Sequence, residues 1–306
     1  MKDTPLFPSR NRDTAALART LARLAATDMP VLVEGETGTG KTAVAEAIHR
    51  RSRPRTNLVV ADCGSWPGTL APAELFGHTA GAFTDATRSR TGWLERAGDG
   101  TLVLDRLEVL APEAQVALLR AVEERCFSPV GGRTNRPLRA RIVALADAGL
   151  KERVSRGVVR QDLYYRLAGF HAVLPPLRCR PEDIVPAARA ELRRLRRRFG
   201  RPCSLTPEAE ELLKACPWPG NFRQLQTVLA AACLRGESDS IGPGDLALGD
   251  VNGSSLLETA AARGETLAHV QRLYALLVLS NHGGNVTRAA KALGVSRRTL
   301  IRWRRE

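Results

Sequence analysis

Long apolar stretches are missing from this sequence. None of the hydrophobic runs in its 306 residues approaches the roughly 18 residues that a membrane-spanning helix requires. The first residues, MKDTPLFPSRNRD, also lack the apolar stretch of a signal peptide. These absences exclude the membrane-spanning class, and they predict a cytoplasmic protein with no membrane partner.

Cysteine is scarce and scattered. The six cysteines form no C-x-x-C pair and have no pair of histidines nearby. Such spacing argues against both a metal centre and a disulfide framework. We therefore expect reduced thiols, as is usual for a cytosolic protein.

Acidic residues are in deficit, with 32 Asp and Glu against 46 Lys and Arg and a net charge of +14. This surplus favours a polyanionic partner such as nucleic acid, although an arginine-rich composition with solvated faces also explains it. Residues 285–306 hold seven basic side chains against Glu306 alone. A second arginine run, at 193–198, is interpreted as a solvated helix face.

A composition of 43% hydrophobic and 25% charged residues suits a globular chain, and the length allows about two domains and a small third. Short apolar runs alternate with helical patterns in the first 176 residues. Strands are expected at Val31–Val33, Leu58–Asp62, Leu102–Asp105, Ala140–Ala146 and Phe170–Leu174. This alternation predicts an α/β fold with a parallel sheet covered on both faces.

The chain after Pro176 has a helical pattern instead. Helices are expected at Glu182–Phe199, Pro207–Ala215 and Asn221–Leu234. Residues 236–255 are rich in Gly, Ser and Asp and are typical of a linker, and a last helical unit fills 264–306.

Residues 31–49, VLVEGETGTGKTAVAEAIH, are the most informative segment. An apolar strand, a glycine-rich loop and an amphipathic helix follow one another, which is the context in which G-x-x-x-x-G-K-[ST] binds phosphate. The loop predicts an ATP site formed by Gly35, Glu36, Thr37, Gly38, Thr39, Gly40, Lys41 and Thr42. Lys41 would reach the β- and γ-phosphates, and the Thr42 hydroxyl would bind Mg²⁺.

A second Mg²⁺ carboxylate is expected at the end of the apolar run 101–105, where Asp105 stands. In hydrolysing proteins a glutamate normally follows this aspartate and activates water as a general base. Here the next residue is Arg106, whose guanidinium cannot accept a proton. Glu108 lies nearby in sequence, but nothing in the sequence places it at the attacking water.

Residues 74–78, ELFGH, and 81–86, GAFTDA, resemble segments of the bacterial enhancer-binding proteins, the AAA+ activators of sigma-54 RNA polymerase. In that family the second segment reads GAFTGA and contacts sigma-54, and here Asp85 replaces its second glycine. The resemblance implies a sigma contact through Gly81, Ala82, Phe83, Thr84, Asp85 and Ala86. The alternative is an ordinary glycine-rich loop that packs Phe83.

Residues 159–167 resemble the family's arginine-finger segment, so Arg160 and Arg166 are candidates for stabilising charge on the transferred phosphoryl group. Fingers act from a neighbouring subunit, which implies a homo-oligomeric ring, with a hexamer expected. Surface ion pairs are the alternative. Residues 218–225, WPGNFRQL, resemble the lid motif, in which Arg223 would sense the γ-phosphate.

Two further positions depart from the family. Asp62 stands where an asparagine often reorients the catalytic glutamate, and Ala146-Asp147 replaces a Thr-Asn sensor pair. With Arg106, these departures surround one water-activating site. An ion pair of Arg106 with Asp62 or with Asp147 could occupy that space.

Residues 284–303 resemble the family's Fis-type helix-turn-helix domain, with Gly294 in the turn and Ser296 as the N-cap of a basic second helix. The predicted DNA-binding residues are Thr287, Arg288, Ser296, Arg297, Arg298, Thr299 and Arg302. Leu300, Ile301 and Trp303 are expected to pack inward, and Leu267–Leu279 to supply a dimer face. A purely structural helical hairpin is the alternative.

The expected domains are a tail at 1–9, the AAA+ α/β subdomain at 10–176, a helical lid at 177–235, a linker at 236–263 and the helix-turn-helix domain at 264–306. The resemblance covers nearly the whole chain and implies that the family's N-terminal regulatory domain is lacking. Control is therefore expected from assembly, expression level or a trans-acting partner.

Two functions remain open at this stage. One is an ATP-hydrolysing activator that binds enhancer DNA and remodels sigma-54 polymerase. The other is an ATP-gated DNA-binding regulator with little or no hydrolysis, acting in a mixed ring or as a repressor. A replication or helicase-loading AAA+ ATPase explains the nucleotide site but leaves residues 81–86 unexplained.

Overall fold

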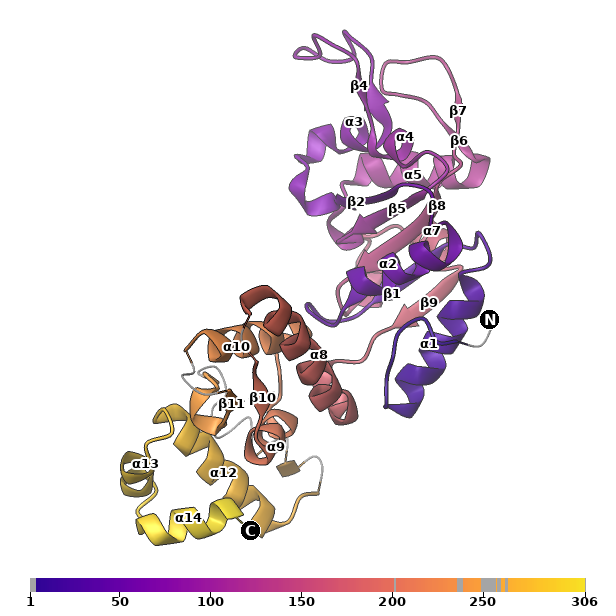
Figure 1. Ribbon diagram of the computed structural model, residues 1–306. Helices are drawn as coiled ribbons and strands as arrows, with labels where there is room; N and C mark the ends of the chain where they lie inside the picture. The colour runs from indigo at the N-terminus through magenta and orange to yellow at the C-terminus, as the bar shows by residue number, and fades with distance from the viewer. Residues whose placement is uncertain are drawn as a thin grey trace. The chain divides into compact units, whose positions relative to one another are not determined.

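The computed structural model describes residues 4–200, 202–235, 239–248, 257, 260–261 and 264–305. The chain forms two compact units (Figure 1). The sheet unit contains Arg12–Leu174 and the residues that precede Ser9. The helical unit contains Ser9–Asn11 and the chain from Pro175 onward.

A five-stranded parallel sheet forms the centre of the sheet unit. In spatial order its strands are β2 (Leu58–Asp62), β5 (Thr101–Asp105), β8 (Arg141–Ala146), β1 (Val31–Glu34) and β9 (Phe170–Val173). All five lie where the sequence predicts strands, to within one residue. The predicted α/β fold class is therefore confirmed.

Helices cover both faces of this sheet. On one face Leu32, Leu104 and their neighbours pack with helices that include α3 (Ala71–Phe76), α4 (Trp93–Ala97), α5 (Pro112–Glu124), α6 (Leu150–Ser155) and α7 (Gln161–Leu167). On the other face Val31, Val33 and Val103 pack with α1 (Arg12–Leu24) and α2 (Lys41–Ser52). Alternate residues of a strand point to opposite faces, which explains why consecutive residues in the middle of β1, β5 and β8 are apolar.

Two short hairpins extend from one end of the sheet unit (Figure 1). The first pairs β3 (Gly77–His78) with β4 (Arg90–Thr91), and the second pairs β6 (Cys126–Phe127) with β7 (Arg136–Pro137). Main-chain bonds tie the two together, because Thr79 N donates to Val130 O at 3.0 Å and Val130 N donates to Gly77 O at 2.9 Å.

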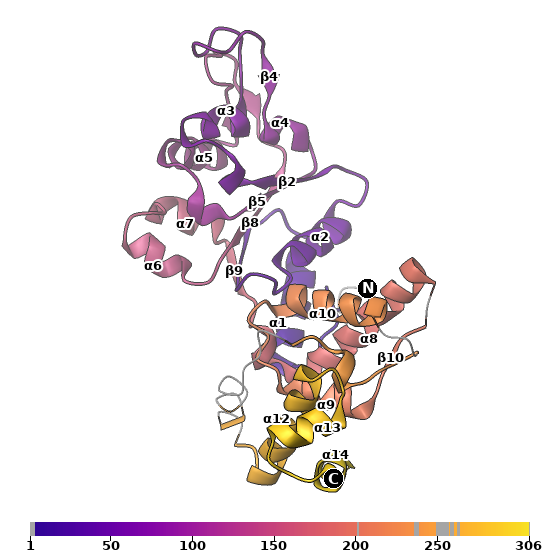
Figure 2. The same ribbon diagram turned by 90° about the vertical axis from the view of Figure 1, so that its left-hand side faces the viewer.

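The helical unit contains α8 (Pro181–Phe199), α9 (Pro207–Ala215) and α10 (Asn221–Arg235), followed by α12 (Leu267–Asn281), α13 (Val286–Ala292) and α14 (Arg297–Arg305) (Figure 2). The helical pattern after Pro176 predicts no strands here, yet β10 (Ser204–Leu205) pairs with β11 (Ser240–Ile241). Within the described residues no helix is both long enough and apolar enough to cross a membrane.

Part of the predicted linker is packed rather than extended. Residues 236–238 and much of 249–263 lie outside the described residues, but 239–248 contribute Ile241, Leu246 and Leu248 to the core of the helical unit. The Ser280 hydroxyl donates to Leu246 O at 2.6 Å, which ties α12 to this segment. Isolated apolar residues among glycines and aspartates gave too weak a periodic signal to predict this packing.

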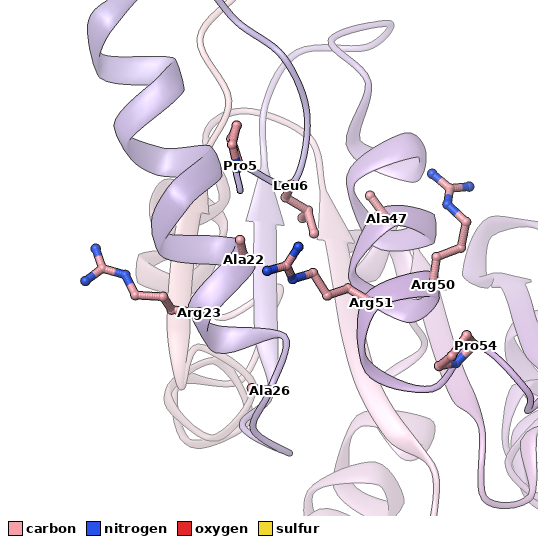
Figure 3. A pocket seen from close by; sticks show the side chains of 9 residues that line it. All are labelled: Pro5, Leu6, Ala22, Arg23, Ala26, Ala47, Arg50, Arg51 and Pro54. Atoms are coloured by element: carbon pink, nitrogen blue, oxygen red, sulfur yellow. The ribbon is translucent and has the colours of Figure 1, made fainter. Parts of the chain in front are cut away.

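A hollow of about 880 Å³ lies between α1 and α2 on the sheet unit (Figure 3). Leu6 and Ala47 contribute apolar surface to it, and Arg23, Arg50 and Arg51 are among its other lining residues. Its lining residues all lie outside the glycine-rich loop at 35–42.

Arg141, the first residue of β8, is buried, and its guanidinium caps the C-terminus of α1. Its guanidinium donates to Leu24 O at 3.0 Å, Ala25 O at 2.9 Å and Met29 O at 3.3 Å. These carbonyls lie at and beyond the C-terminus of α1, where main-chain acceptors lack partners within the helix and a positive charge is favourable. Burial lowers the pKa of Arg141, while Asp28 acts to raise it.

Replacing Arg141 with leucine should destabilise the protein by about 3 kcal/mol, because buried carbonyl oxygens lose charged donors. Urea unfolding of the full chain measures this. The matched control is Arg139→Leu, whose side chain is 67% exposed and 3.7 Å from Asp99; it should change stability by less than about 0.5 kcal/mol. Equal unfolding midpoints for the two variants would contradict the capping role.

Candidate functional site

The carboxyl ends of the parallel strands bring the candidate residues to one edge of the sheet. Asp62 ends β2 and lies beside Asp105, which ends β5. Asp147 directly follows β8, and β8 pairs with β1, the strand that enters the glycine-rich loop. Ligands of open α/β sheets bind at this edge.

The glycine-rich loop has the backbone conformation that a phosphate cradle needs. Gly38 and Gly40 have φ values of 81° and 101°, in the left-handed region that favours glycine. A Cβ on Gly35 would lie 3.0 Å from Leu174 O, so this glycine permits close packing. Helix α2 then starts at Lys41, and Thr42 is exposed in its first turn.

Lys41 folds back over the loop and contacts a carboxylate. Its Nζ donates to Gly35 O at 2.7 Å and lies 2.6 Å from Asp147 Oδ1. The Thr37 hydroxyl lies 3.5 Å from both carboxylate oxygens of Asp147. The ammonium that the sequence assigns to phosphate is therefore ion-paired with the residue at the sensor position.

Arg106 pairs with Asp62, one of the two partners that the sequence analysis considered. The contact is bidentate, with Nε 2.7 Å from Oδ1 and Nη2 2.6 Å from Oδ2. The main chain at Arg106 is in the left-handed region, with a φ of 55°. The Arg106 guanidinium packs closely against Gly64, where a Cβ atom would collide with it. Hydrogen bonding from Arg106 holds the pKa of Asp62 below its usual 3.8, although burial acts to raise it.

Glu108 is buried and engaged by the main chain. Its carboxylate accepts a hydrogen bond from Asp147 N at 3.3 Å, and its side chain is closed off from solvent. Nearby, burial first and then the charges of Asp62, Asp105 and Glu108 raise the pKa of the Cys63 thiol to about 12. These three carboxylates therefore lie close enough together to act on the same thiol.

Glu34 is a structural anchor that the sequence analysis did not identify. Its carboxylate accepts from Gly149 N at 2.9 Å and Leu150 N at 3.2 Å, and lies 2.8 Å from His171 Nε2. It thus joins the end of β1 to the start of α6 and to β9. A charged residue closing an otherwise apolar run was the only sequence signal, and its partners are distant in sequence.

The finger candidates lie at α7. The Arg160 guanidinium donates to both carboxylate oxygens of Asp162, at 3.1 and 2.8 Å, and its main-chain N donates to Gln115 Oε1 at 2.9 Å. Arg166 is exposed in the last turn of α7. Their roles as fingers remain predictions.

Residues 81–86 form a closed turn at the tip of the first hairpin. Gly81 N donates to Ala86 O at 2.7 Å, and Ala86 N donates to Phe83 O at 2.9 Å. The Phe83 ring packs on His78 with centroids 4.9 Å apart, whereas Thr84 and Asp85 are exposed. Phe83 is therefore partly packed within a tip that faces solvent.

The lid motif is anchored by residues other than Arg223. Trp218 is fully buried and its Nε1 donates to Leu213 O at 2.7 Å, while Asn221 Oδ1 accepts from Leu177 N at 2.7 Å. Arg223 is exposed in the first turn of α10. Its role as a phosphate sensor remains a prediction.

Helices α13 and α14 form the predicted helix-turn-helix, and Ser296 is confirmed as an N-cap because its hydroxyl accepts from Thr299 N at 3.0 Å. Leu300 is buried, but Ile301 is 40% exposed, so the expectation that it packs inward is wrong. Thr299 is half-buried, and the other predicted DNA-binding residues are exposed: Thr287, Arg288, Ser296, Arg297, Arg298 and Arg302.

Helix α12 packs in two directions. Leu273, Leu276 and Leu277 join the core of the lid, while Ala275 and Leu279 join the core of the helix-turn-helix. Leu267 and Tyr274 stay exposed. A dimer contact through this helix remains a prediction.

Replacing Arg106 with alanine should raise the pKa of Asp62 toward 3.8, because the bidentate hydrogen bond is lost. Since the wild-type pKa is depressed, the pair stabilises the fold above that ordinary value, and its contribution is lost as pH falls through the folded-state pKa. Carboxyl NMR titration measures the shift. Arg160→Ala, which removes a pair with Asp162 instead, should leave Asp62 unchanged, and an unmoved Asp62 in Arg106→Ala would refute the pairing.

Three protein families match successive parts of the chain, and several known proteins are similar to most of it. Residues 8–172 match the sigma-54 interaction domain, residues 178–261 the AAA+ ATPase lid domain, and residues 276–306 the Fis family of bacterial regulatory proteins. The transcriptional regulatory protein ZraR of Klebsiella oxytoca is 39% identical over 292 residues, which cover 94% of this chain and 65% of ZraR. The C4-dicarboxylate transport transcriptional regulatory protein DctD of Rhizobium meliloti is 38% identical, with 93% and 60% covered.

Solved structures of NtrX from Brucella abortus resemble the chain as well. The complex with ADP has a TM-score of 0.73 at 27% identity, and it covers 97% of this chain and 68% of NtrX. The complex with ATP has the same TM-score at 26% identity. The chain thus spans 60 to 65% of the length of the curated relatives named above. From its sheet unit to its C-terminal helices, it belongs to the family of sigma-54-dependent transcriptional regulators with AAA+ and Fis-type domains.

Proposed function

We propose that this chain is a transcriptional regulator that binds ATP, contacts sigma-54 RNA polymerase and binds enhancer DNA. The observation that carries the proposal is a solvent-facing 81–86 tip on the same unit as the glycine-rich loop. Such an arrangement allows the nucleotide state of the sheet edge to bias a hairpin of the same domain. The match to the sigma-54 interaction domain across that unit supports it.

The residues present fit Mg·ATP chemically. Gly38 and Gly40 direct main-chain N–H groups around the loop, and the start of α2 favours an anion. Thr42 and Asp105 offer the hard oxygen ligands that Mg²⁺ prefers. Mg²⁺ would neutralise phosphate charge there, while Lys41 would hold the β- and γ-phosphates. NtrX, which was crystallised with ADP and with ATP, supports this use of the fold.

The sigma contact would use the exposed part of the tip. Thr84 and Asp85 face solvent, and a depression of about 340 Å³ beside them is lined by Leu70, Ala82, Phe83 and Val130 among others. A polar rim next to a small apolar depression suits a protein partner. Asp85 adds a negative charge and stiffens the main chain relative to glycine.

Assembly would complete the enzyme. Arg160 and Arg166 are exposed on the sheet unit. In an oligomer, these side chains of one subunit could contact the nucleotide bound by the neighbouring subunit. We therefore propose a homo-oligomeric ring, a hexamer, with dimeric DNA-binding domains and control by a trans-acting regulator. A regulator of transcription of this kind would work in the cytoplasm.

One observation favours a second function, the ATP-gated regulator with little or no hydrolysis. Arg106 occupies the place of the usual general base, and its guanidinium is fixed to Asp62 by two short hydrogen bonds. Glu108 is buried and accepts from Asp147 N, so its carboxylate is committed to the main chain. Such a protein would bind ATP, assemble on DNA and act within a mixed ring or as a repressor.

Steady-state ATP turnover with enhancer DNA, together with open-complex formation on a sigma-54 promoter, separates the two functions. Turnover with open complexes identifies the activator, and tight ATP binding without turnover identifies the gated regulator.

Because a general base contributes about 10²- to 10⁴-fold to a reaction rate, Arg106→Glu should raise ATP turnover at least about tenfold. The control Arg19→Glu, on the exposed face of α1, should leave turnover unchanged. Equal and rapid ATP turnover in the wild type, Arg106→Glu and Arg19→Glu would contradict the hypothesis that the hydrolytic site is impaired.

DNA binding through α14 predicts a change in salt dependence. Neutralising Arg297, Arg298 and Arg302 to glutamine should weaken binding and reduce the slope of log K against log salt by up to about three, since each phosphate contact releases counterions. Fluorescence anisotropy across a salt series measures this slope. The control neutralises exposed arginines of α8 (Arg193, Arg196 and Arg197), and an equal loss there would assign DNA binding to general charge.

A further inference from the structure

The Lys41–Asp147 pair lies against the glycine-rich loop, because Lys41 Nζ also donates to Gly35 O and Asp147 lies beside the Thr37 hydroxyl. Lys41 Nζ is 2.6 Å from Asp147 Oδ1, and the Lys41 side chain is only 10% exposed. In phosphate loops of this type the lysine contacts the β- and γ-phosphates. Asp147 and a bound triphosphate would therefore both contact the Lys41 ammonium.

We propose that Asp147 is a specificity-determining residue that competes with the terminal phosphate for Lys41, so that the site holds a nucleoside diphosphate more tightly than a triphosphate. The proposal rests on the nucleotide binding proposed above and adds a preference to it. It concerns the ground state of the site and is independent of whether ATP is hydrolysed.

Distance alone makes the competition severe. A phosphate oxygen that accepts a charge-assisted hydrogen bond from Lys41 Nζ lies about 2.8 Å from it, so with Asp147 Oδ1 at 2.6 Å the two anionic oxygens are at most about 5.4 Å apart. Unit charges this close repel strongly at a partly buried site. Since the lysine contacts both the β- and the γ-phosphate, a triphosphate brings one more negative charge than a diphosphate to the group that Asp147 already pairs with.

The other charged residues at the ends of β2 and β5 and in the turn after β5 do not offset this repulsion. Arg106 is committed to Asp62, and Asp105 and Glu108 add two further carboxylates to the same edge. Mg²⁺ at Asp105 would offset charge for both nucleotides, so it does not remove the difference between them.

Asp147 is also held in position. Its main-chain N donates to Glu108, it directly follows the buried strand β8, and its carboxylate lies 3.5 Å from the Thr37 hydroxyl of the loop. Rotating the carboxylate away would cost it both Lys41 and Thr37. A neutral asparagine of nearly the same shape would keep a partner for Thr37 and would release Lys41.

The test compares two affinities in the full-length chain. Isothermal titration with Mg²⁺ present gives the Kd of ADP and of a non-hydrolysable ATP analogue, adenylyl imidodiphosphate. Wild type should bind ADP more tightly, and Asp147→Asn should shift the ratio of the two Kd values at least about tenfold toward the triphosphate. Glu46→Gln, which removes one carboxylate from the exposed side of α2, should leave the ratio unchanged.

Inorganic pyrophosphate and tripolyphosphate, used to displace ADP from the wild type, provide a measurement that needs no variant. Pyrophosphate should displace ADP at a lower concentration than tripolyphosphate does. An unchanged Kd ratio in Asp147→Asn, or weaker triphosphate binding in that variant, would overturn the role of Asp147 and leave nucleotide binding intact. Failure of folded wild type and variant to bind either nucleotide would instead overturn the proposed function and this preference with it.

Discussion

Parallel strand pairing is the constraint on which the site depends. Because β2, β5, β8 and β1 run in the same direction, their carboxyl ends meet at one edge, and the residues at these ends become neighbours although they are up to 112 positions apart in the chain (from Gly35 to Asp147). Both faces of the sheet are covered, so this edge is where polar groups can gather without cost to the core. The glycine-rich loop, Asp105 and the three departures from the family pattern all lie there.

Electrostatics at this edge set the chain apart from the pattern of its family. Arg106 and Asp62 neutralise each other, and Lys41 and Asp147 do the same. Each pair places a charge where the family pattern has a group that acts on water or phosphate. The two pairs also share a main-chain link, because Glu108, two residues after Arg106, accepts from Asp147 N.

The helical unit shows how a weakly patterned segment can still determine packing. Leu246 and Leu248 lie among glycines and aspartates, yet they are buried against α12, and Ser280 adds a hydrogen bond to Leu246 O. As a result α12 supports the lid as well as the helix-turn-helix. Arg297, Arg298, Arg302 and Arg304 of α14 remain exposed, whereas Leu300 on the same helix is buried.

Local signals in the sequence determined the five strands, the loop at 35–42 and the cap at Ser296, because apolar periodicity, glycine and a capping hydroxyl act within a few residues. The sequence also identified Arg106, Asp62 and Asp147 as unusual and named two possible partners for Arg106. Only the tertiary structure decided that Arg106 pairs with Asp62 while Asp147 pairs with Lys41. It alone revealed the anchors Glu34 and Arg141 and the burial of Ile241, Leu246 and Leu248. These outcomes depend on which distant groups meet at short range, and a linear pattern carries no such distances.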